Sequence, residues 1–106
     1  MVAAAPNLTR VTGTISGRRP HPALEGWDLV ALAVEGTEPV PGRADLVSRR
    51  LRPGAPLEVA VRRELLGDAG PGWRVVARVR GTAGDVLAER APAPGDLVLE
   101  PAPPPG

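Results

Sequence analysis

The chain has 106 residues, a net charge of +1 and no Cys, and all of its 13 basic residues are Arg. This length fits a single domain with one modest core, and the absence of Cys excludes disulfides, thiolate metal sites and a Cys nucleophile. The near balance of 13 Arg against 12 Asp plus Glu excludes a field of excess positive charge, and no apolar run approaches the ~20 residues of a membrane-spanning helix.

Proline and glycine divide the chain into short runs. Fourteen Pro and thirteen Gly fall at nearly regular intervals, and the residues between them are rich in Val and Leu. This punctuation is typical of many short strands rather than helices. We predict a flexible N-terminus over residues 1–9, one β domain over 10–100 and a Pro-rich tail over 101–106, which we expect to be a solvated polyproline segment.

Three strands are expected in the first half of the chain. Residues 10–16 place Val11 and Ile15 on one face and Thr side chains on the other. Residues 27–35 are apolar on both faces, which is typical of a central strand, and a short helix is the alternative. Residues 43–51 have mixed polarity that suits either a strand or a helical turn, and the turn sequence that follows them favours a strand.

Four further strands are expected in the second half. Residues 57–65 alternate, with Leu57, Val59 and Val61 pointing inward, and residues 96–101 supply the last strand. Between them, residues 73–80 and 85–89 predict a hairpin with its loop at 81–84. One face of the first hairpin strand carries Trp73, Val75, Ala77 and Val79, and the other carries Arg74, Val76, Arg78 and Arg80. Placing Arg80 opposite Asp85 sets Val79 beside Val86.

About seven short strands separated by turn signals predict an all-β fold. We expect a single small antiparallel β-sandwich. A small β-barrel is the alternative, and the sequence does not separate the two.

Catalytic and metal-binding residues are not predicted anywhere in the chain. His21 is the lone His, and it lies between two prolines in an expected surface loop, without the further His or Cys that a metal site needs. Ser16 and Ser48 lie outside a nucleophile elbow, and the Asp and Glu residues fit solvated positions at turns and strand starts. We therefore expect no catalytic, cofactor-binding or metal-binding residue, no cofactor and no enzymatic activity.

Arginine gives the sequence its one positive functional signal. The candidate binding face consists of Arg74, Arg78, Arg80, Arg62 and Arg50. Arg suits phosphate recognition, but Asp85 and Glu89 are expected to face the hairpin arginines, and opposite charges across strands are ordinary on a solvated sheet face. Bases also stack on aromatic side chains, and the chain has only Trp27 and Trp73, which we expect in the core or at its rim.

Four segments between about residues 10 and 100 resemble a known family: VTGTISG, WDLVALAVEG, LRPGAPLEVAVRREL and GWRVVARVRGTAGDVLAER. They are similar to the small β-sandwich lipoproteins typified by type III secretion pilotins and their YbaY-type relatives. The hairpin positions that match are Trp73, Val75, Ala77, Arg78, Val79 and Gly84, with Trp where Tyr is usual and a longer spacing to the glycine. The resemblance implies a non-enzymatic binding or assembly module. The lipid-anchoring Cys of these lipoproteins is absent, so membrane tethering and the pilotin role are not implied.

We accordingly expect a non-catalytic protein-binding or assembly module, of a secretion-like or chaperone-like kind, that binds another protein or a second copy of itself. One alternative is a carrier or enzyme with a pocket for a small apolar ligand between the sheets. Another is a weak nucleic-acid binder that uses the arginine face, although nucleic acid is not the expected partner.

The first residues lack the features of a signal peptide. The expected location is cytoplasmic for the chain as given, and periplasmic or exported if a leader has been removed.

Overall fold

The computed structural model describes residues 7–103, so the predicted flexible N-terminus lies mostly, and the predicted Pro-rich tail partly, outside the described residues. Asn7 is held in place, because its side-chain amide donates to the Gly81 carbonyl at 3.0 Å and its Oδ1 accepts from Gly81 N–H at 2.7 Å. Leu8 N–H donates to the Ala44 carbonyl at 3.0 Å. Asn7 and Leu8 are therefore anchored to the barrel just before the first strand, although the predicted flexible N-terminus included them.

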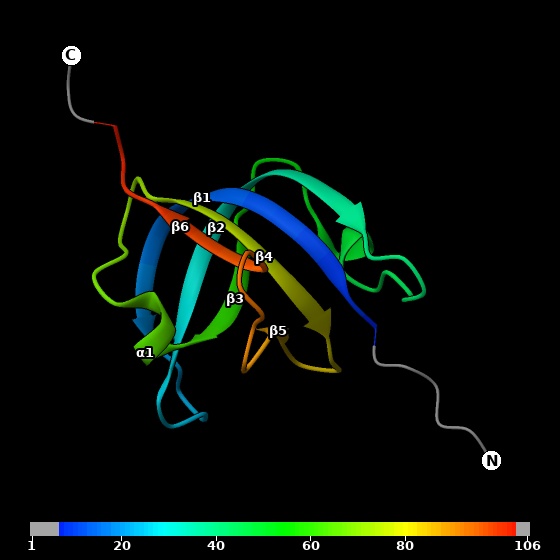
Figure 1. The fold of residues 1–106 in the computed structure, drawn as a ribbon, viewed down its shortest axis with the longest axis horizontal. Helices are drawn as coiled ribbons and strands as arrows, with labels where there is room; N and C mark the ends of the chain where they lie inside the picture. The colour runs from blue at the N-terminus through cyan, green and yellow to red at the C-terminus, as the bar shows by residue number, and fades with distance from the viewer. Residues whose placement is uncertain (1–6, 104–106) are drawn as a thin grey trace.

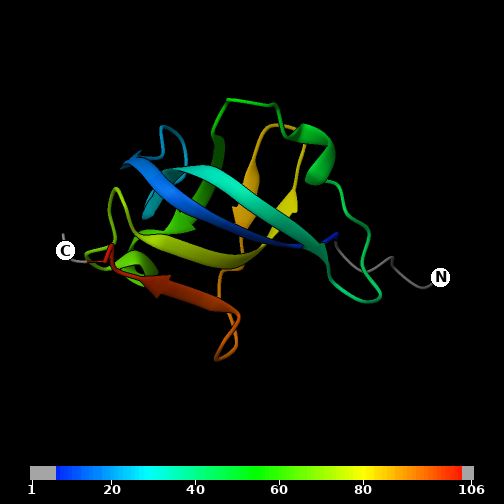
Figure 2. The ribbon, with the colours of Figure 1, turned by 90° about the horizontal axis from the view of Figure 1, so that it is seen from above.

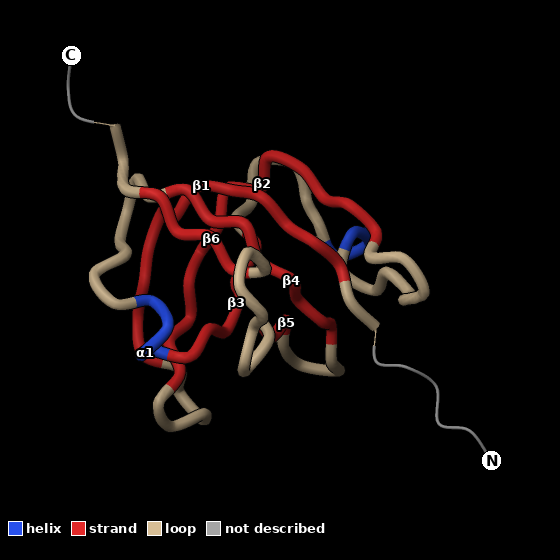
Figure 3. The backbone as a smooth tube through the Cα atoms, viewed as in Figure 1, coloured by secondary structure: helices blue, strands red, loops and turns tan. Residues whose placement is uncertain are grey.

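Strands make up nearly half of the described chain, and helical structure there is confined to two short segments (Figures 1 and 3). The strands are β1 (Thr9–Pro20), β2 (Trp27–Pro39), β3 (Leu57–Arg62), β4 (Arg74–Gly81), β5 (Val86–Ala88) and β6 (Leu97–Glu100). The 3₁₀ turn η1 (Ser48–Arg50) lies between β2 and β3, and the one-turn helix α1 (Arg63–Leu66) lies between β3 and β4.

Five of the strands close into a barrel. β1 pairs with both β2 and β4, β2 with β3, β3 in parallel with β5, and β5 with β4. β6 is an extra strand outside this closed ring. It pairs with residues 74–77 of β4, and β5 pairs with residues 79–81 of the same strand. The all-β prediction is confirmed. The barrel alternative fits this closed sheet, and the expected sandwich of about seven strands is not what forms.

The closed five-stranded barrel, with one extra strand on β4, is similar in architecture to the five-stranded Greek-key barrel called the OB fold. Figure 2 shows β1 and β2 crossing the molecule as long, curved ribbons, with β6 lying alongside β4. Fold alone does not define function, because OB barrels serve many unrelated purposes.

Bulges let the long strands β1 and β2 curve around the barrel. Their register shifts between Thr12 and Gly13, and again between Ile15 and Gly17, so that Glu35 on β2 and Ser16 on β1 are extra residues without a paired partner. Such bulges bend a strand and increase its twist. The sequence predicted shorter strands here, and the bulges are the reason that each strand can continue past its predicted end and still follow the barrel.

Residues 43–51 do not form the strand that the turn sequence after them favoured. Asp45 accepts hydrogen bonds from the N–H groups of Val47 and Ser48, both at 3.0 Å, and this closes a turn that leads into η1. Val47 is fully buried in the core although it lies in no strand. The helical-turn alternative is therefore closer to the structure, and the side-chain cap at Asp45 is the physical reason.

The predicted strand over 57–65 is shorter than expected, and the predicted hairpin has a different register. β3 ends at Arg62, and α1 takes up the following residues. Val79 pairs with Ala88 rather than Val86, and Arg80 pairs with Leu87 rather than Asp85. A shift of two residues keeps every side chain on its predicted face, because side chains alternate with a period of two.

The core fills the inside of the barrel with aliphatic side chains. The largest fully buried side chains include Ile15, Leu32, Val11, Val30, Val47, Val59 and Val79. Trp73 packs against this core as a partly buried neighbour, as predicted, but Trp27 lies outside the core cluster. Neither described helix is long and apolar enough to cross a membrane.

Candidate functional site

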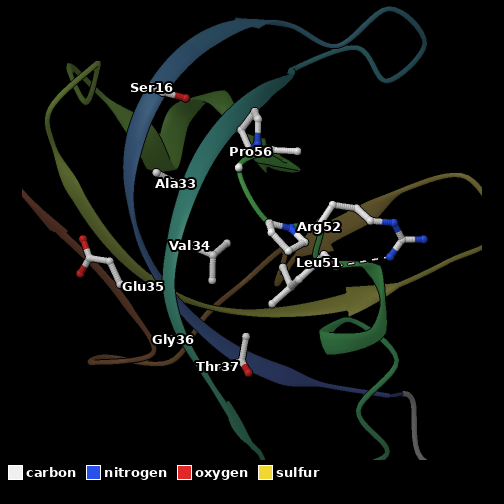
Figure 4. Close-up of a pocket in the computed structure, with 12 residues that line it drawn as sticks. Ser16, Ala33, Val34, Glu35, Gly36, Thr37, Leu51, Arg52 and Pro56 are labelled. Carbon is white, nitrogen blue, oxygen red and sulfur yellow. Dashed lines mark hydrogen bonds between the residues drawn. The ribbon is translucent and has the colours of Figure 1, made fainter.

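A groove runs beside the part of β2 that β3 does not cover. β2 pairs with β1 along its whole length, but its pairing with β3 ends at Leu32 opposite Leu57. Within residues 7–103, no backbone hydrogen bond joins residues 33–39 to the 51–56 segment that follows η1. A cavity of about 720 Å³ separates the two (Figure 4).

Two prolines explain why the β2–β3 ladder stops. If the register continued, Pro56 would lie opposite Ala33 and Pro53 opposite Gly36, and neither proline has an N–H group to donate. The chain instead turns, with Ala55 N–H donating to the Arg52 carbonyl at 3.1 Å. The turn carries Gly54 at a φ of +76°, in the left-handed region that glycine adopts readily. The loop therefore bends away and leaves the strand edge open.

The groove has an apolar floor and an exposed strand edge. Val34 and Leu51 both pack against the core, and Figure 4 shows Val34 directed towards the side of the groove that carries Leu51. Ala33 and Gly36 are exposed. Glu35 points away from the groove, where it accepts a hydrogen bond from the Thr14 hydroxyl at 2.7 Å. The groove thus offers backbone groups and apolar side chains, and its one acidic side chain is engaged elsewhere.

The predicted arginine face is divided among several places. Arg74, Arg78 and Arg80 share the outer side of β4, as predicted. Arg74 lies 3.6 Å from Glu35, and Arg78 pairs with Glu89 at 3.2 Å and with Asp96 at 3.0 Å. Acidic side chains therefore neutralise two of these three arginines.

The other two arginines of the predicted face serve local structure. Arg50 lies in η1 and donates to the carbonyls of Thr82 and Asp85, at 2.5 and 2.9 Å. Arg62, at the end of β3, donates to the Arg90 carbonyl at 3.0 Å and pairs with Glu64. The structure does not bring the five arginines together into one continuous stripe.

His21 lies in the β1–β2 loop, as expected, but its side chain is buried, with only 5% exposed. Its Nδ1 accepts from the N–H groups of Ala23 and Leu24, at 3.0 and 2.9 Å, and its Nε2 lies 3.2 Å from Asp85 Oδ1. Because Nδ1 accepts, the ring proton lies on Nε2 and donates to Asp85. His21 therefore organises the loop, and no group of three metal-ligating side chains occurs in the described part of the chain.

Two carboxylates that the sequence placed at solvated positions are hydrogen-bonded inside the structure. Ser48 and Thr9 donate to Asp45, at 2.5 and 2.7 Å, and the Ser48 hydrogen bonds are the main reason that the pKa of Asp45 lies far below its ordinary value. Burial raises the pKa of Asp28, but hydrogen bonds and charge from Arg18 and Arg63 outweigh that effect and lower it. The positions of Asp28 and Asp45 in the sequence, near the start of a predicted strand, did not predict these hydrogen bonds.

The outer side of β2 and β3 is partly covered. Leu29 and Ala60 lie opposite each other on this side and are buried. Arg19 reaches across β2 to Glu58 at 3.0 Å, and His21 reaches Asp85. In OB folds the face of strands 2 and 3 is the usual surface for oligonucleotides and oligosaccharides. Here Arg19, near the end of β1, and His21, in the following loop, lie over part of this side.

Comparisons with protein families, curated proteins and solved structures found no match. The pilotin-like resemblance therefore stays a prediction.

Proposed function

We propose that the protein is a non-catalytic binding module that takes up an extended segment of a partner protein along the exposed edge of β2. The observation that carries this proposal is the open edge over residues 33–37, beside a groove with an apolar floor. A partner strand would gain main-chain hydrogen bonds from the edge and side-chain contacts from Val34 and Leu51.

The barrel architecture supports this use of the groove. A long unpaired edge is a template for strand addition, and proteins usually cover or interrupt such edges. Here Pro53 and Pro56 keep the molecule's own chain from covering it. The partner is another protein or a second copy of this chain, and an assembly role of the pilotin-like kind remains part of the proposal.

A pocket between two sheets, which the small-ligand alternative required, has less support. The strands of residues 7–103 all belong to one sheet, and the inward-facing aliphatic side chains fill the interior of the barrel. The groove also has no nucleophile next to a base. These observations favour binding over catalysis.

Single-cysteine variants test the proposal in a chain that has no Cys of its own. Ala33→Cys places one thiol in the groove, and Ala83→Cys places one in the exposed β4–β5 loop as the matched control. A thiol-linked photocrosslinker at position 33 should capture one partner segment in extracts of the native host, and the control should not. A bulky maleimide at position 33 should abolish binding of that partner.

Capture of the same proteins from both positions would contradict the proposal. So would partner binding that survives the maleimide at position 33. Crosslinks from position 33 to a second copy of this chain would identify the partner as the protein itself.

A further inference from the structure

A second pocket, of about 480 Å³, lies on the outer side of the barrel and shares no residue with the β2 groove. Leu24 from the β1–β2 loop, Trp27 at the start of β2 and Leu87 from β5 supply apolar lining. Arg80 at the end of β4 and Arg90 after β5 line the same pocket. A volume of this size falls within the range of roughly 300–1,000 Å³ that is common for small-molecule sites.

Hydrogen bonds fix the apolar wall of this pocket. Trp27 N–H donates to the Leu24 carbonyl at 3.2 Å, and His21 N–H donates to the Trp27 carbonyl at 2.9 Å. His21 Nδ1 accepts from Leu24 N–H, and its Nε2 ties the loop to Asp85. The position of the Leu24 and Trp27 backbone therefore does not depend on a ligand, which lowers the entropic cost of binding.

The pocket lining carries excess positive charge, because three arginines, Arg43, Arg80 and Arg90, contribute to it. Arg80 and Arg90 are exposed, and neither guanidinium has a hydrogen-bond or ion-pair partner within residues 7–103. Glu89 is the acidic residue of the lining, and it already pairs with Arg78 at 3.2 Å. Trp27 is partly exposed beside these two arginines and packs outside the core.

We propose that this pocket binds a small organic anion. Its apolar body packs on Trp27, Leu24 and Leu87, and its carboxylate or phosphate group pairs with Arg80 and Arg90. Guanidinium groups match the planar geometry of both anions, and such charge-assisted hydrogen bonds are among the strongest in proteins. A single indole ring and a compact pocket suit one small molecule better than a chain of stacked bases. The site is independent of the strand-binding groove.

Nuclear magnetic resonance provides a direct test, because the chain has only two Trp. Trp73→Phe assigns the Trp27 indole signal by elimination. The probes are 1-naphthylacetate and 1-naphthyl phosphate, with the neutral 1-naphthylacetamide as the matched control. Both anions should shift the Trp27 indole signal on titration, and the amide should bind at least tenfold more weakly. Comparing the two anions distinguishes a carboxylate site from a phosphate site.

Paired variants isolate the two arginines. Arg80→Gln with Arg90→Gln should weaken binding of the anions at least tenfold. Arg10→Gln with Arg49→Gln removes the same charge from residues outside the pocket and should leave the affinity unchanged. Urea unfolding of both double variants checks that the fold is retained.

Three results would overturn the proposal. The first is equal affinity for the amide and the anions, or no shift of the indole signal by either anion at millimolar concentration. The second is the same loss of affinity in both double variants. The third is binding of a single-stranded DNA 12-mer at ~150 mM salt more tightly than either naphthyl anion, which would assign the pocket to nucleic acid.

Discussion

Gly13 shows how one residue position controls the curvature of β1 and β2. It lies at a register shift, and a Cβ atom added there would lie 2.7 Å from the Ala33 carbonyl oxygen. That oxygen belongs to the backbone of β2, so it cannot move without disturbing the sheet. Ala33 also lines the proposed groove, so this close contact lies directly across β2 from it.

We predict that Gly13→Ala destabilises the fold by about 1–3 kcal/mol, the usual cost of forcing an extra methyl group into a packed site. Gly17→Ala is the matched control, because it lies in the same strand and an added Cβ would meet only Ala31 Cβ at 3.9 Å. Urea unfolding of the two variants measures the difference. Equal free energies of unfolding would show that the close approach at Gly13 relaxes without cost.

At the scale of elements, Asp28 joins three segments at one end of the barrel. It lies at the start of β2 and accepts from Arg18 Nε of β1 at 2.8 Å and from Arg63 Nε of α1 at 2.9 Å. Arg18 also donates to the carbonyls of Gly67 and Ala69, at 2.8 and 2.7 Å. Arg18 therefore ties α1 and the turn after it to the barrel, whereas the Arg63 side chain bonds, within residues 7–103, to Asp28 alone.

We predict that Arg18→Gln destabilises the protein by about 1–3 kcal/mol, because it leaves a buried carboxylate and two carbonyls without this donor. Arg63→Gln should cost less than about 1 kcal/mol, since its side chain is 52% exposed and solvent screens the pair. Urea unfolding gives both values, and amide hydrogen exchange over residues 63–69 should rise more in Arg18→Gln. Equal losses in the two variants would refute the proposed difference.

Element boundaries show how far the sequence could predict this fold. Local alternation placed Val75, Ala77 and Val79 on the buried face of β4, and these positions are confirmed. The turn at Asp45 was missed although its hydrogen bonds from the N–H groups of Val47 and Ser48 are local, because the mixed polarity of residues 43–51 fits a strand as well as a turn. The register of the hairpin was missed because the Thr82 hydroxyl and the Asp85 backbone bond to each other and set a different turn.

At the scale of the whole molecule, closure of the barrel depends on contacts that local patterns do not encode. β1 meets β4 about sixty residues later, and β3 meets β5 through the single pair Ala60 and Leu87. Alternating strands predict a buried face equally well in a sandwich and in a barrel. The open edge of β2 also follows from non-local pairing, because Pro53 and Pro56 become significant only once Leu57 is known to pair with Leu32.

The stability of the whole molecule should decrease in acid because of Asp28 and Asp45. Both carboxyl groups have a lower pKa in the folded protein than their ordinary value, so the folded state holds fewer protons than the unfolded chain at mildly acidic pH. The ordinary pKa of Asp in an unfolded chain is about 3.9. The stabilisation that these groups provide is therefore complete above about pH 5 and is lost as the pH falls through about 4 towards their folded pKa values.

We predict that Asp45→Asn lowers the free energy of unfolding at pH 7 by about 1–3 kcal/mol, and that the gap between this variant and the parent protein narrows steadily between about pH 5 and pH 2. The gap narrows because, in this range, Asp45 takes up a proton in the unfolded chain of the parent while it stays ionised in the folded state, which lowers the parent's free energy of unfolding. The variant has no carboxyl group at this position and therefore lacks this effect. Asp68→Asn is the matched control, since Asp68 is exposed and has no hydrogen bond or ion pair among residues 7–103. Its unfolding curve should run parallel to that of the parent across the pH range.

Urea unfolding at a series of pH values gives all three curves. A gap for Asp45→Asn that is as large at pH 2.5 as at pH 7 would show that the Ser48 and Thr9 hydrogen bonds do not depend on the charge of the carboxylate.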